Sequence, residues 1–375
     1  MGDQSRIEWT DATWNPVVGC SIVSPGCTNC YAMATAHGLE RRFGSAKYGG
    51  LTKAVNGHPV WTGQVRLAEE ALDQPLRWRR GRRIFVNSMS DLFHEGLPDA
   101  AIDRVFAVMA LCPQHTFQIL TKRVERMRDY IKRGAKRWDR VDLDVWSAIA
   151  VELTGSACAA GALEELPWPL PNVWLGVSVE DQARADERIP LLLETPAAKR
   201  FLSCEPLLGP VRILGRLMAG IDPGQCTTCG HGHGFTRCPN TGGIARERTS
   251  VQSGRTLCSD FRRKYFAIDW VIAGGESGSG ARPMLPGWAR SLRDQCQAAA
   301  VPFFFKQWGE WLDEEDATRL NHAPGPEMFD AAGKPTGLRW RPYDPADPLG
   351  GAMIRVGKRQ AGRLLDGCTW DELPA

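Results

Sequence analysis

The chain has 375 residues, of which 43% are hydrophobic and 24% charged, and its formal net charge is +3. These are ordinary values for a globular protein, and they argue against a disordered chain. No stretch approaches the roughly 20 apolar residues that span a bilayer, and the N-terminus is acidic and tryptophan-rich where a signal peptide would be basic and then apolar. We therefore expect a cytoplasmic protein with no membrane partner, in which clustered cysteines serve as metal ligands or redox groups.

The first predicted element is a short strand in "WNPVVG", residues 14–19, and a loop with Cys20, Cys27 and Cys30 follows it. Three thiolates are one ligand short of a closed tetrahedral metal site. His37 is the nearest candidate for the fourth ligand, but it falls in a segment that is typical of a helix, "NCYAMATAHGLERR".

Two interpretations of this loop remain open. In the first, a distant residue completes a structural zinc site. In the second, the three thiolates hold an iron–sulfur cluster and leave one iron for an exogenous ligand, since such clusters normally take four cysteines. Tyr31, directly after the third cysteine, would then cover the cofactor.

Six later apolar runs read as strands buried on both faces, as in a parallel sheet. They occupy residues 83–91, 116–123, 172–181, 199–206, 269–278 and 301–311. Each run ends in polar or glycine residues: Asn87, Ser88 and Asp91; Thr121, Lys122 and Arg123; Ser178, Glu180 and Asp181; Ser203 and Glu205; Gly274, Gly275 and Glu276; Lys306 and Gln307. Since functional groups of α/β folds gather at the carboxyl ends of the strands, these residues predict one shared polar site.

Helix-like segments lie between most of these runs, at 97–112, 125–136, 181–195 and 285–300. Alternating strands and helices predict an α/β fold, specifically a full or partial TIM-like (β/α) barrel. We assign residues 1–215 and 267–312 to this barrel. Residues 313–375 are rich in proline and glycine and are expected to form an irregular C-terminal appendage.

A Gly-, Arg- and Cys-rich insertion at residues 216–266 interrupts the alternation, and it is longer than an ordinary crossover needs. Two of its cysteines are separated by two residues, which makes a tight metal-binding turn, and two further cysteines could complete a tetrahedral site. This pattern predicts structural zinc. The expected ligands are Cys226, Cys229, Cys238 and Cys258, with His231 and His233 as substitutes. The alternative is that some of these cysteines are free surface thiols.

The segment "RWRRGRR", residues 77–83, packs five arginines and one tryptophan just before a predicted strand. Such a patch can grip phosphates and stack on a base, which would suit a nucleic-acid or nucleotide substrate. It can equally be a solvated loop, because a net charge of +3 gives little long-range steering.

The loop with three clustered cysteines, the last followed by an aromatic residue, resembles the radical S-adenosylmethionine superfamily. That superfamily most often spaces its cysteines three and then two residues apart, whereas this chain has six and then two. The wider motifs "GCTNCYA", "VNSMSDLFH", "LGVSVEDQ", "RFLSCEPLLGP" and "PFFFKQWGEW" are similar to one narrower group, the radical-SAM-like, three-Cys-motif proteins of phages and bacteria. The resemblance implies a barrel and a cofactor class, but no substrate.

What the resemblance implies can be placed on this sequence. Cys20, Cys27 and Cys30 would ligate a 4Fe–4S cluster, and S-adenosylmethionine would chelate the open iron. A reductant such as flavodoxin or ferredoxin would supply the electron that yields a 5′-deoxyadenosyl radical. The residues expected to bind the cofactor are Asn87, Ser88, Asp91, Ser178, Glu180, Gly274, Gly275 and Glu276.

Lys122, Glu205 and Lys306, with Arg123 and Gln307, are then left for a substrate of anionic or nucleotide-like character. Each of them can instead be half of a salt bridge at the barrel rim. Two other functions compete: a zinc-stabilised nucleic-acid-binding protein without catalysis, and a metal-independent hydrolase that uses Glu180, Glu205 and Glu276 for acid–base chemistry.

Overall fold

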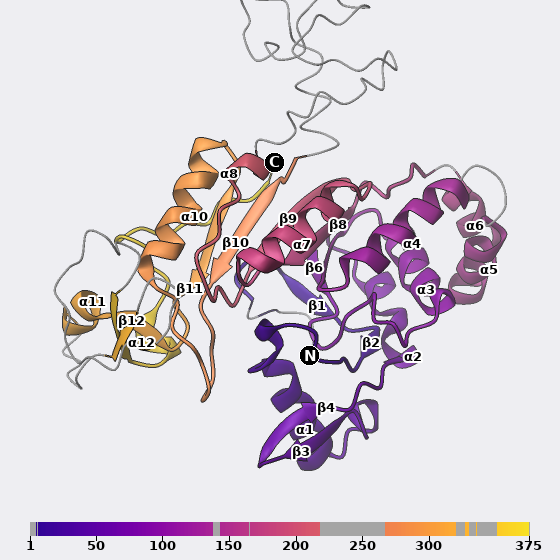
Figure 1. Cartoon of the computed structure of the whole chain (residues 1–375). Helices are drawn as coiled ribbons and strands as arrows, with labels where there is room; N and C mark the ends of the chain where they lie inside the picture. Colours follow the sequence, from indigo (N-terminus) through magenta and orange to yellow (C-terminus); the bar gives the residue numbers. More distant parts are fainter. Residues whose placement is uncertain are drawn as a thin grey trace, which may run out of the picture.

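A seven-stranded, wholly parallel sheet forms the centre of the computed structural model, which describes residues 5, 7–137, 143–164, 166–217, 267–319, 327–329, 335 and 351–374. Its strands, in spatial order, are β1 (Ala12–Trp14), β6 (Arg83–Val86), β7 (Thr116–Thr121), β8 (Val173–Ser178), β9 (Lys199–Cys204), β10 (Trp270–Gly274) and β11 (Phe303–Gln307). The spatial order follows the chain order, and β1 and β11 are the two edges. The sheet is therefore an open, partial barrel within a mixed α/β fold (Figure 1).

Helices follow the strands in the predicted alternation. They are α3 (Asp99–Ala110), α4 (Val124–Arg137), α7 (Gln182–Leu193), α8 (Leu214–Leu217) and α10 (Pro286–Ala298). Two more helices, α5 (Leu143–Thr154) and α6 (Ala157–Glu164), lie between α4 and β8, and α5 packs on α3. The six predicted strands and the four predicted helices between them are confirmed.

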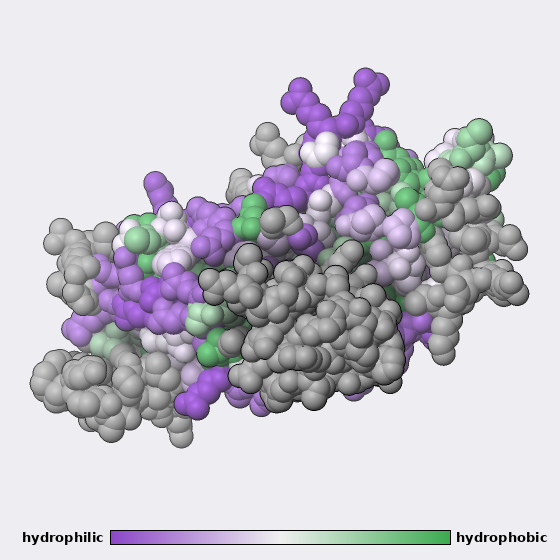
Figure 2. Space-filling model, turned by 90° about the horizontal axis from the view of Figure 1, so that it is seen from above, coloured by the Kyte–Doolittle hydropathy of each residue, from purple (hydrophilic) through white to green (hydrophobic). Residues whose placement is uncertain are grey.

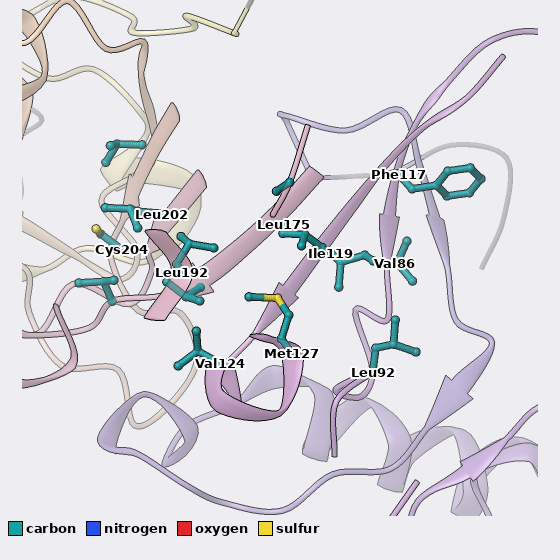
Figure 3. Packing of buried hydrophobic residues seen from close by; sticks show 14 of the residues in the cluster. Val86, Leu92, Phe117, Ile119, Val124, Met127, Leu175, Leu192, Leu202 and Cys204 are labelled. Carbon is teal, nitrogen blue, oxygen red and sulfur yellow. The ribbon is translucent and has the colours of Figure 1, made fainter. Parts of the chain in front are cut away.

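The outer face of the sheet is a continuous apolar layer under the helices. Figure 3 shows Ile119 of β7 and Leu175 of β8 on the side where α4 contributes Met127 and α7 contributes Leu192. All four side chains are at most 1% exposed. Burial on this scale, at about 25 cal/mol per Å² of apolar surface, is the main term that holds helices on a sheet.

The inner, concave face carries a separate aromatic cluster. Trp9 packs edge-on against Phe85 of β6 and Trp270 of β10, with ring centroids 4.8 and 6.0 Å apart. Phe201 and Phe304 belong to the same cluster. These rings come from within the strands or, for Trp9, from the segment before β1, whereas the polar residues follow the carboxyl ends of the strands.

The prediction for the first strand is wrong in its position. The strand was expected at residues 14–19, but β1 ends at Trp14, and β2 (Val17–Val18) instead pairs antiparallel with β5 (Arg66–Leu67). Pro16 explains the break, because proline has no amide hydrogen to continue a ladder.

A small lobe follows the loop of the three N-terminal cysteines and lies beside the sheet (Figure 1). It consists of α1 (Tyr31–Phe43), η2 (Ala46–Tyr48) and the hairpin of β3 (Thr52–Val55) and β4 (His58–Trp61). The short helix η1 (Pro25–Cys27) precedes this lobe, whereas α2 (Glu69–Leu72) and η3 (Gln74–Arg77) follow it and pack on α3. The hairpin turns on Asn56 and Gly57, whose φ values are 49° and 79°, the pair that a two-residue turn requires. Its side chains form a core of their own with α1.

The C-terminal region contains more regular structure than the irregular appendage predicted there. Its described part comprises β12 (Trp311–Asp313), α11 (Glu314–Arg319), β13 (Glu327–Phe329), β14 (Gly351–Arg355) and α12 (Lys358–Ala361). The three strands form an antiparallel sheet in the order β12-β14-β13. Beyond α12 the chain returns to β11, where Asp371 bridges Phe304 and the amide of Phe305 donates to Trp370 O over 2.9 Å. This segment covers the edge of the main sheet.

Hydrophilic side chains dominate the described surface in Figure 2, and the hydrophobic patches on that face are small and separate. None of the described helices combines the length and the apolar composition needed to cross a membrane.

Candidate functional site

The three N-terminal cysteines lie on the loop between β2 and α1, above the carboxyl ends of the parallel strands. Cys27 ends the short helix η1, and Cys30 is the N-cap residue of α1. We call residues 20–30 the cysteine loop. Ile22 and Val23 at its tip are 48% and 42% exposed, so apolar burial does not hold the tip in place.

A buried carboxylate after β8 holds the middle of the cysteine loop. Glu180 is fully buried, and its Oε1 accepts a hydrogen bond from the Ser24 hydroxyl over 2.5 Å. Its other oxygen pairs with Arg188 of α7 at 2.9 Å. Although burial alone would raise it, the charges of Lys122 and Arg188 hold the pKa of Glu180 below its usual range. Glycine at position 26 is required here, because a Cβ atom would lie 2.5 Å from Glu180 Cγ.

A second carboxylate, after β10, holds the far end of the loop. Glu276 Oε2 accepts from Asn29 Nδ2 at 3.0 Å, and Arg282 forms a bidentate pair with both oxygens of Glu276. Arg282 also donates to Pro25 O at 2.9 Å. Glu180 and Glu276, which the sequence predicts as cofactor contacts, therefore anchor the cysteine loop in this structure.

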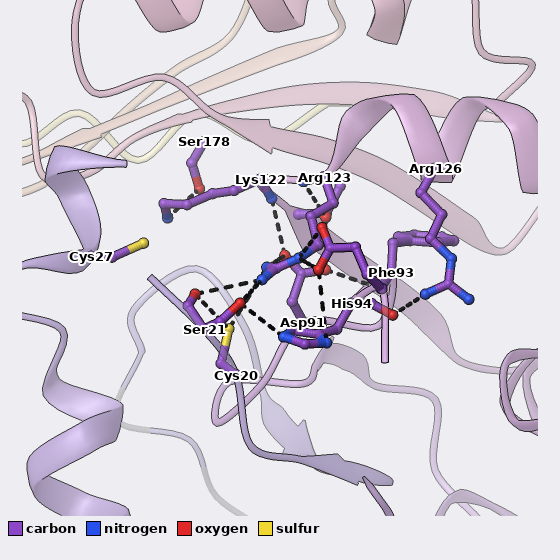
Figure 4. A network of polar contacts seen from close by, with 12 residues as sticks. Cys20, Ser21, Cys27, Asp91, Phe93, His94, Lys122, Arg123, Arg126 and Ser178 are labelled. Carbon is purple, nitrogen blue, oxygen red and sulfur yellow. Dashed lines mark hydrogen bonds and ion pairs between the residues drawn. The ribbon is translucent and has the colours of Figure 1, made fainter. Parts of the chain in front are cut away.

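The beginning of the loop is held by Arg123, which follows β7 (Figure 4). Its guanidinium donates to Asp91 Oδ2 at 3.1 Å, to Ser21 Oγ at 2.6 Å and to Cys20 Sγ at 3.7 Å. Nε donates to the carboxylate of Glu95 at 2.9 Å. Asp91 and the side chain of Arg123 are both almost fully buried, so this is an interior ion pair.

The electrostatic environment differs between the thiols. Burial, the charge of Asp91 and the neighbouring Cys30 and Cys27 together raise the pKa of Cys20 to about 12. Burial also raises the pKa of Cys30, while backbone N–H groups at the start of α1 and the nearby Lys122 oppose the shift. The cysteines thus lie near enough to influence one another, and without a metal Cys20 and Cys30 are protonated at neutral pH.

Within the described part of the chain, no three His, Cys, Asp or Glu side chains lie close enough together to bind one metal ion. The candidate fourth ligand His37 has its Nδ1 within 3.0 Å of Thr52 Oγ1. His94, the histidine nearest to the loop, accepts from Gly96 N at Nδ1 and lies 2.9 Å from Ser21 Oγ through Nε2. Both histidines therefore already have partners.

Two lysines reach the concave side of the sheet at the strand ends. Lys306 Nζ donates to Glu205 Oε1 at 2.6 Å, and Lys122 Nζ donates to Ser178 Oγ at 3.0 Å. The Lys306–Glu205 pair is the salt bridge that the sequence allows as an alternative to a substrate contact. Gly274 lies beside this pair, since a Cβ atom there would be 3.4 Å from Glu205.

Asn87 and Ser88 directly follow β6, next to the cysteine loop. Asn87 has a φ of 62° and accepts from Val17 N at 3.2 Å, which leaves its buried Nδ2 without a hydrogen-bond partner. The Tyr31 hydroxyl donates a hydrogen bond to the backbone oxygen of Ser88 over 2.9 Å. Tyr31 is 55% exposed and lies over this strand end.

Gly275 and Gln307 have structural contacts. A Cβ atom at position 275 would lie 1.8 Å from Trp308 O, so backbone packing rather than a ligand explains this glycine. Gln307 donates to Ser277 Oγ at 3.1 Å.

The arginine-rich segment at 77–83 lies at the amino end of β6, opposite the edge that carries the cysteine loop. Trp78 is 7% exposed with Arg82 stacked 5.0 Å from its ring centroid, and Arg83 pairs with Asp11 at 3.1 Å. Of the two interpretations of this segment, base stacking by Trp78 is therefore wrong, because the ring is buried. The predicted zinc ligands Cys226, Cys229, Cys238 and Cys258, with His231 and His233, lie outside the described residues.

A family model described as "Protein of unknown function (DUF5131)" matches residues 4–374. The chain belongs to this family. No curated protein and no solved structure matches it. The family description assigns no reaction, so any function of this DUF5131 member has to be argued from its site.

Sequence reasoning missed the residues that hold the loop. They are Ser21, Ser24, Asn29, His94, Glu95, Arg188 and Arg282. The only local signal was that Ser21, Ser24 and Asn29 lie between the cysteines. The other partners come from distant segments, as in the Asn29–Glu276 contact that joins positions 247 residues apart.

Proposed function

We propose that the protein is an iron–sulfur enzyme of the radical S-adenosylmethionine type that modifies or repairs a substrate of nucleotide-like or other anionic character. The observation that carries this proposal is the position of Cys20, Cys27 and Cys30. They share one loop, they interact electrostatically, and the loop is tied to the carboxyl ends of an open parallel half-barrel.

The set of donors fits a cluster better than a single zinc ion. One tetrahedral zinc ion with bonds of about 2.3 Å needs its sulfur ligands within about 4 Å of each other. In a 4Fe–4S cluster each thiolate binds a different iron, so the three sulfurs lie farther apart. Of the histidines that the structure describes, the two nearest candidates for a fourth ligand, His37 and His94, have other partners.

Asn87 supports a cofactor contact at the end of β6. Its unpartnered Nδ2 is buried and is a donor, so it suits the carboxylate of S-adenosylmethionine rather than the amino group. Burying such a donor without an acceptor costs about 1–3 kcal/mol, which a ligand oxygen would recover. Ser88, Asp91, Ser178 and Gly274 line the same ends of the strands, although Asp91 is engaged by Arg123.

When bound, the cluster and S-adenosylmethionine would supply one-electron radical chemistry that removes a hydrogen atom from the substrate, with flavodoxin or ferredoxin as the reductant. The residues of the chain would bind and orient the cofactor and the substrate. Cys20, Cys27 and Cys30 hold the cluster, Tyr31 covers one side, and the Lys306–Glu205 pair and Lys122 face the substrate.

The acid–base hydrolase is disfavoured by the carboxylates themselves. Glu180, Glu205 and Glu276 are each paired with a cation, at 2.9, 2.6 and 2.6 Å. A general base needs a free lone pair near the proton that it removes, and fully buried Glu180 has both oxygens occupied.

The test is to purify the full chain without oxygen and measure iron, sulfide and zinc. S-adenosylmethionine and dithionite are then added, and 5′-deoxyadenosine is measured. We expect about four irons and four sulfides per chain, with one zinc if the insertion cysteines bind as predicted. Cys27→Ser should remove the cluster and the product, whereas Cys158→Ser, at an exposed free cysteine, should keep both.

A colourless protein with two zincs and no iron would overturn the proposal in favour of the zinc-stabilised binding protein. A cluster-loaded protein that yields no 5′-deoxyadenosine would overturn the catalytic part alone.

A further inference from the structure

The cysteine loop contains one contact that neither the sequence motifs nor the proposed chemistry calls for. Every nitrogen of the Arg123 guanidinium has an acceptor: Nε has Glu95, Nη1 has Asp91 and Cys20, and Nη2 has Ser21. The side chain is 5% exposed. A guanidinium held in this way cannot rotate away from the sulfur, because its planar fork is fixed on several sides.

The carboxylates beside Arg123 have other donors. Asp91 also accepts from Thr121 Oγ1 at 2.7 Å, from Lys122 N at 3.1 Å and from Phe93 N at 3.0 Å. Glu95 is 66% exposed, so water screens its charge. The charge of Asp91 also acts on Cys20, but the guanidinium of Arg123 is the charged group in direct contact with the Cys20 sulfur, so its removal changes the charge nearest to that sulfur.

The three cysteines differ in the polar groups that contact them. Cys30 faces the N-terminus of α1 and Lys122, and the contact found for Cys27 is Ser24 Oγ at 3.9 Å. Among the described contacts, a guanidinium bonds only to Cys20. Arg123 is thus placed to act on one corner of any metal centre that the loop holds.

Resting on the proposed function, we propose that Arg123 is a positioning residue of the cluster site: it fixes Cys20 toward the cluster, and its charge raises the reduction potential of that cluster. Reduction adds a negative charge to the cluster. A buried cation in contact with a ligand sulfur stabilises that charge, since electrostatic interactions are strong in a poorly solvated interior.

The test is a spectroelectrochemical titration of the anaerobic, reconstituted full chain in four forms: wild type, Arg123→Met, Arg123→Lys and Arg128→Met. Arg128 is the matched control, because it lies on α4, the helix that begins directly after Arg123, pairs with Asp129 and Glu194, and has no described contact with the loop. Iron and sulfide contents are measured first for each form.

We expect Arg123→Met to lower the equilibrium constant for one-electron reduction at least tenfold, which corresponds to a potential 59 mV more negative. Arg123→Lys keeps the charge but loses the fork, so its shift should be smaller and in the same direction. Arg128→Met should keep the wild-type potential.

An Arg123→Met variant that keeps its cluster and the wild-type potential would overturn the inference and leave the proposed function standing. Where Arg123→Met fails to fold, Arg123→Gln is titrated in its place, because it removes the charge and keeps a hydrogen-bond donor, and a wild-type potential in that variant overturns the inference. A wild-type chain that takes up no iron contradicts the proposed function itself, and the metal analysis shows this before any titration.

Discussion

Replacing Glu180 by glutamine tests whether buried ion pairs hold the cysteine loop. Glu180 is fully buried and Arg188 is 2% exposed, and their charged atoms are 2.9 Å apart. Removing one partner of a buried pair costs about 3–5 kcal/mol, because the remaining charge is left without compensation. We expect the lower end, about 3 kcal/mol, since the amide oxygen still accepts one hydrogen bond. At about 2–4 °C per kcal/mol, the melting temperature should fall by about 6–12 °C.

The control is Glu187→Gln, which removes the second carboxylate near the same arginine. Glu187 is 55% exposed and 3.8 Å from Arg188 Nε, so its loss should change stability by less than about 0.5 kcal/mol. Thermal unfolding followed by circular dichroism at pH 7 measures both variants. Equal losses in the two variants, or no loss for Glu180→Gln, would refute the role of the buried pair.

The same pair predicts a pH dependence. The pKa of Glu180 is lowered in the folded chain, because Lys122 and Arg188 outweigh the effect of burial. Its contribution to stability is therefore present above the unfolded value of about 4.3 and is lost as the pH falls through the lower folded value. The difference in melting temperature between wild type and Glu180→Gln should shrink below about pH 4 and stay constant from pH 6 to 8.

Three further predictions concern the packing of the chain. Gly26→Ala should destabilise the chain by about 1–3 kcal/mol in a urea titration, because the new Cβ overlaps Glu180. Its control is Gly38→Ala on α1, where the new Cβ meets no atom within 4 Å and should stabilise the chain by up to about 1 kcal/mol. Gly275→Ala places a Cβ 1.8 Å from a backbone carbonyl and should give insoluble protein; a soluble variant with wild-type melting would contradict the packing. Deleting residues 362–375 uncovers the edge of β11 and should cause aggregation in size-exclusion chromatography, and a monodisperse product would show that the edge needs no cover.

The sheet could be predicted from the sequence because its signal is local. Runs of four to six apolar residues, such as "WVIAG" in β10, are buried on both faces and can be recognised without knowing which strands they pair with. The first strand was misplaced because Pro16 divides a single apolar stretch into β1 and β2, which belong to different sheets. The hairpin also had a local signal, Asn56-Gly57, that was not used.

The site could be predicted only in part, because composition does not reveal which polar groups bind one another. The sequence places Glu180 and Glu276 at strand ends, and they do lie there. Whether such a carboxylate faces a ligand or the loop depends on contacts such as Ser24–Glu180, which joins residues 156 positions apart. For the same reason Arg123 was expected at the substrate, although it contacts Cys20.

These contacts imply that residues at the strand ends set the position of the cysteine loop. Three anchors from different strands hold it: Arg123 after β7, Glu180 after β8 and Glu276 after β10. Each anchor is a charged group fixed by a second charged group, so the loop gains a defined geometry without an apolar core of its own. Under the proposed function, a site supported in this way would keep one metal position open to an exchanging ligand, because the surrounding residues hold the cysteines in place.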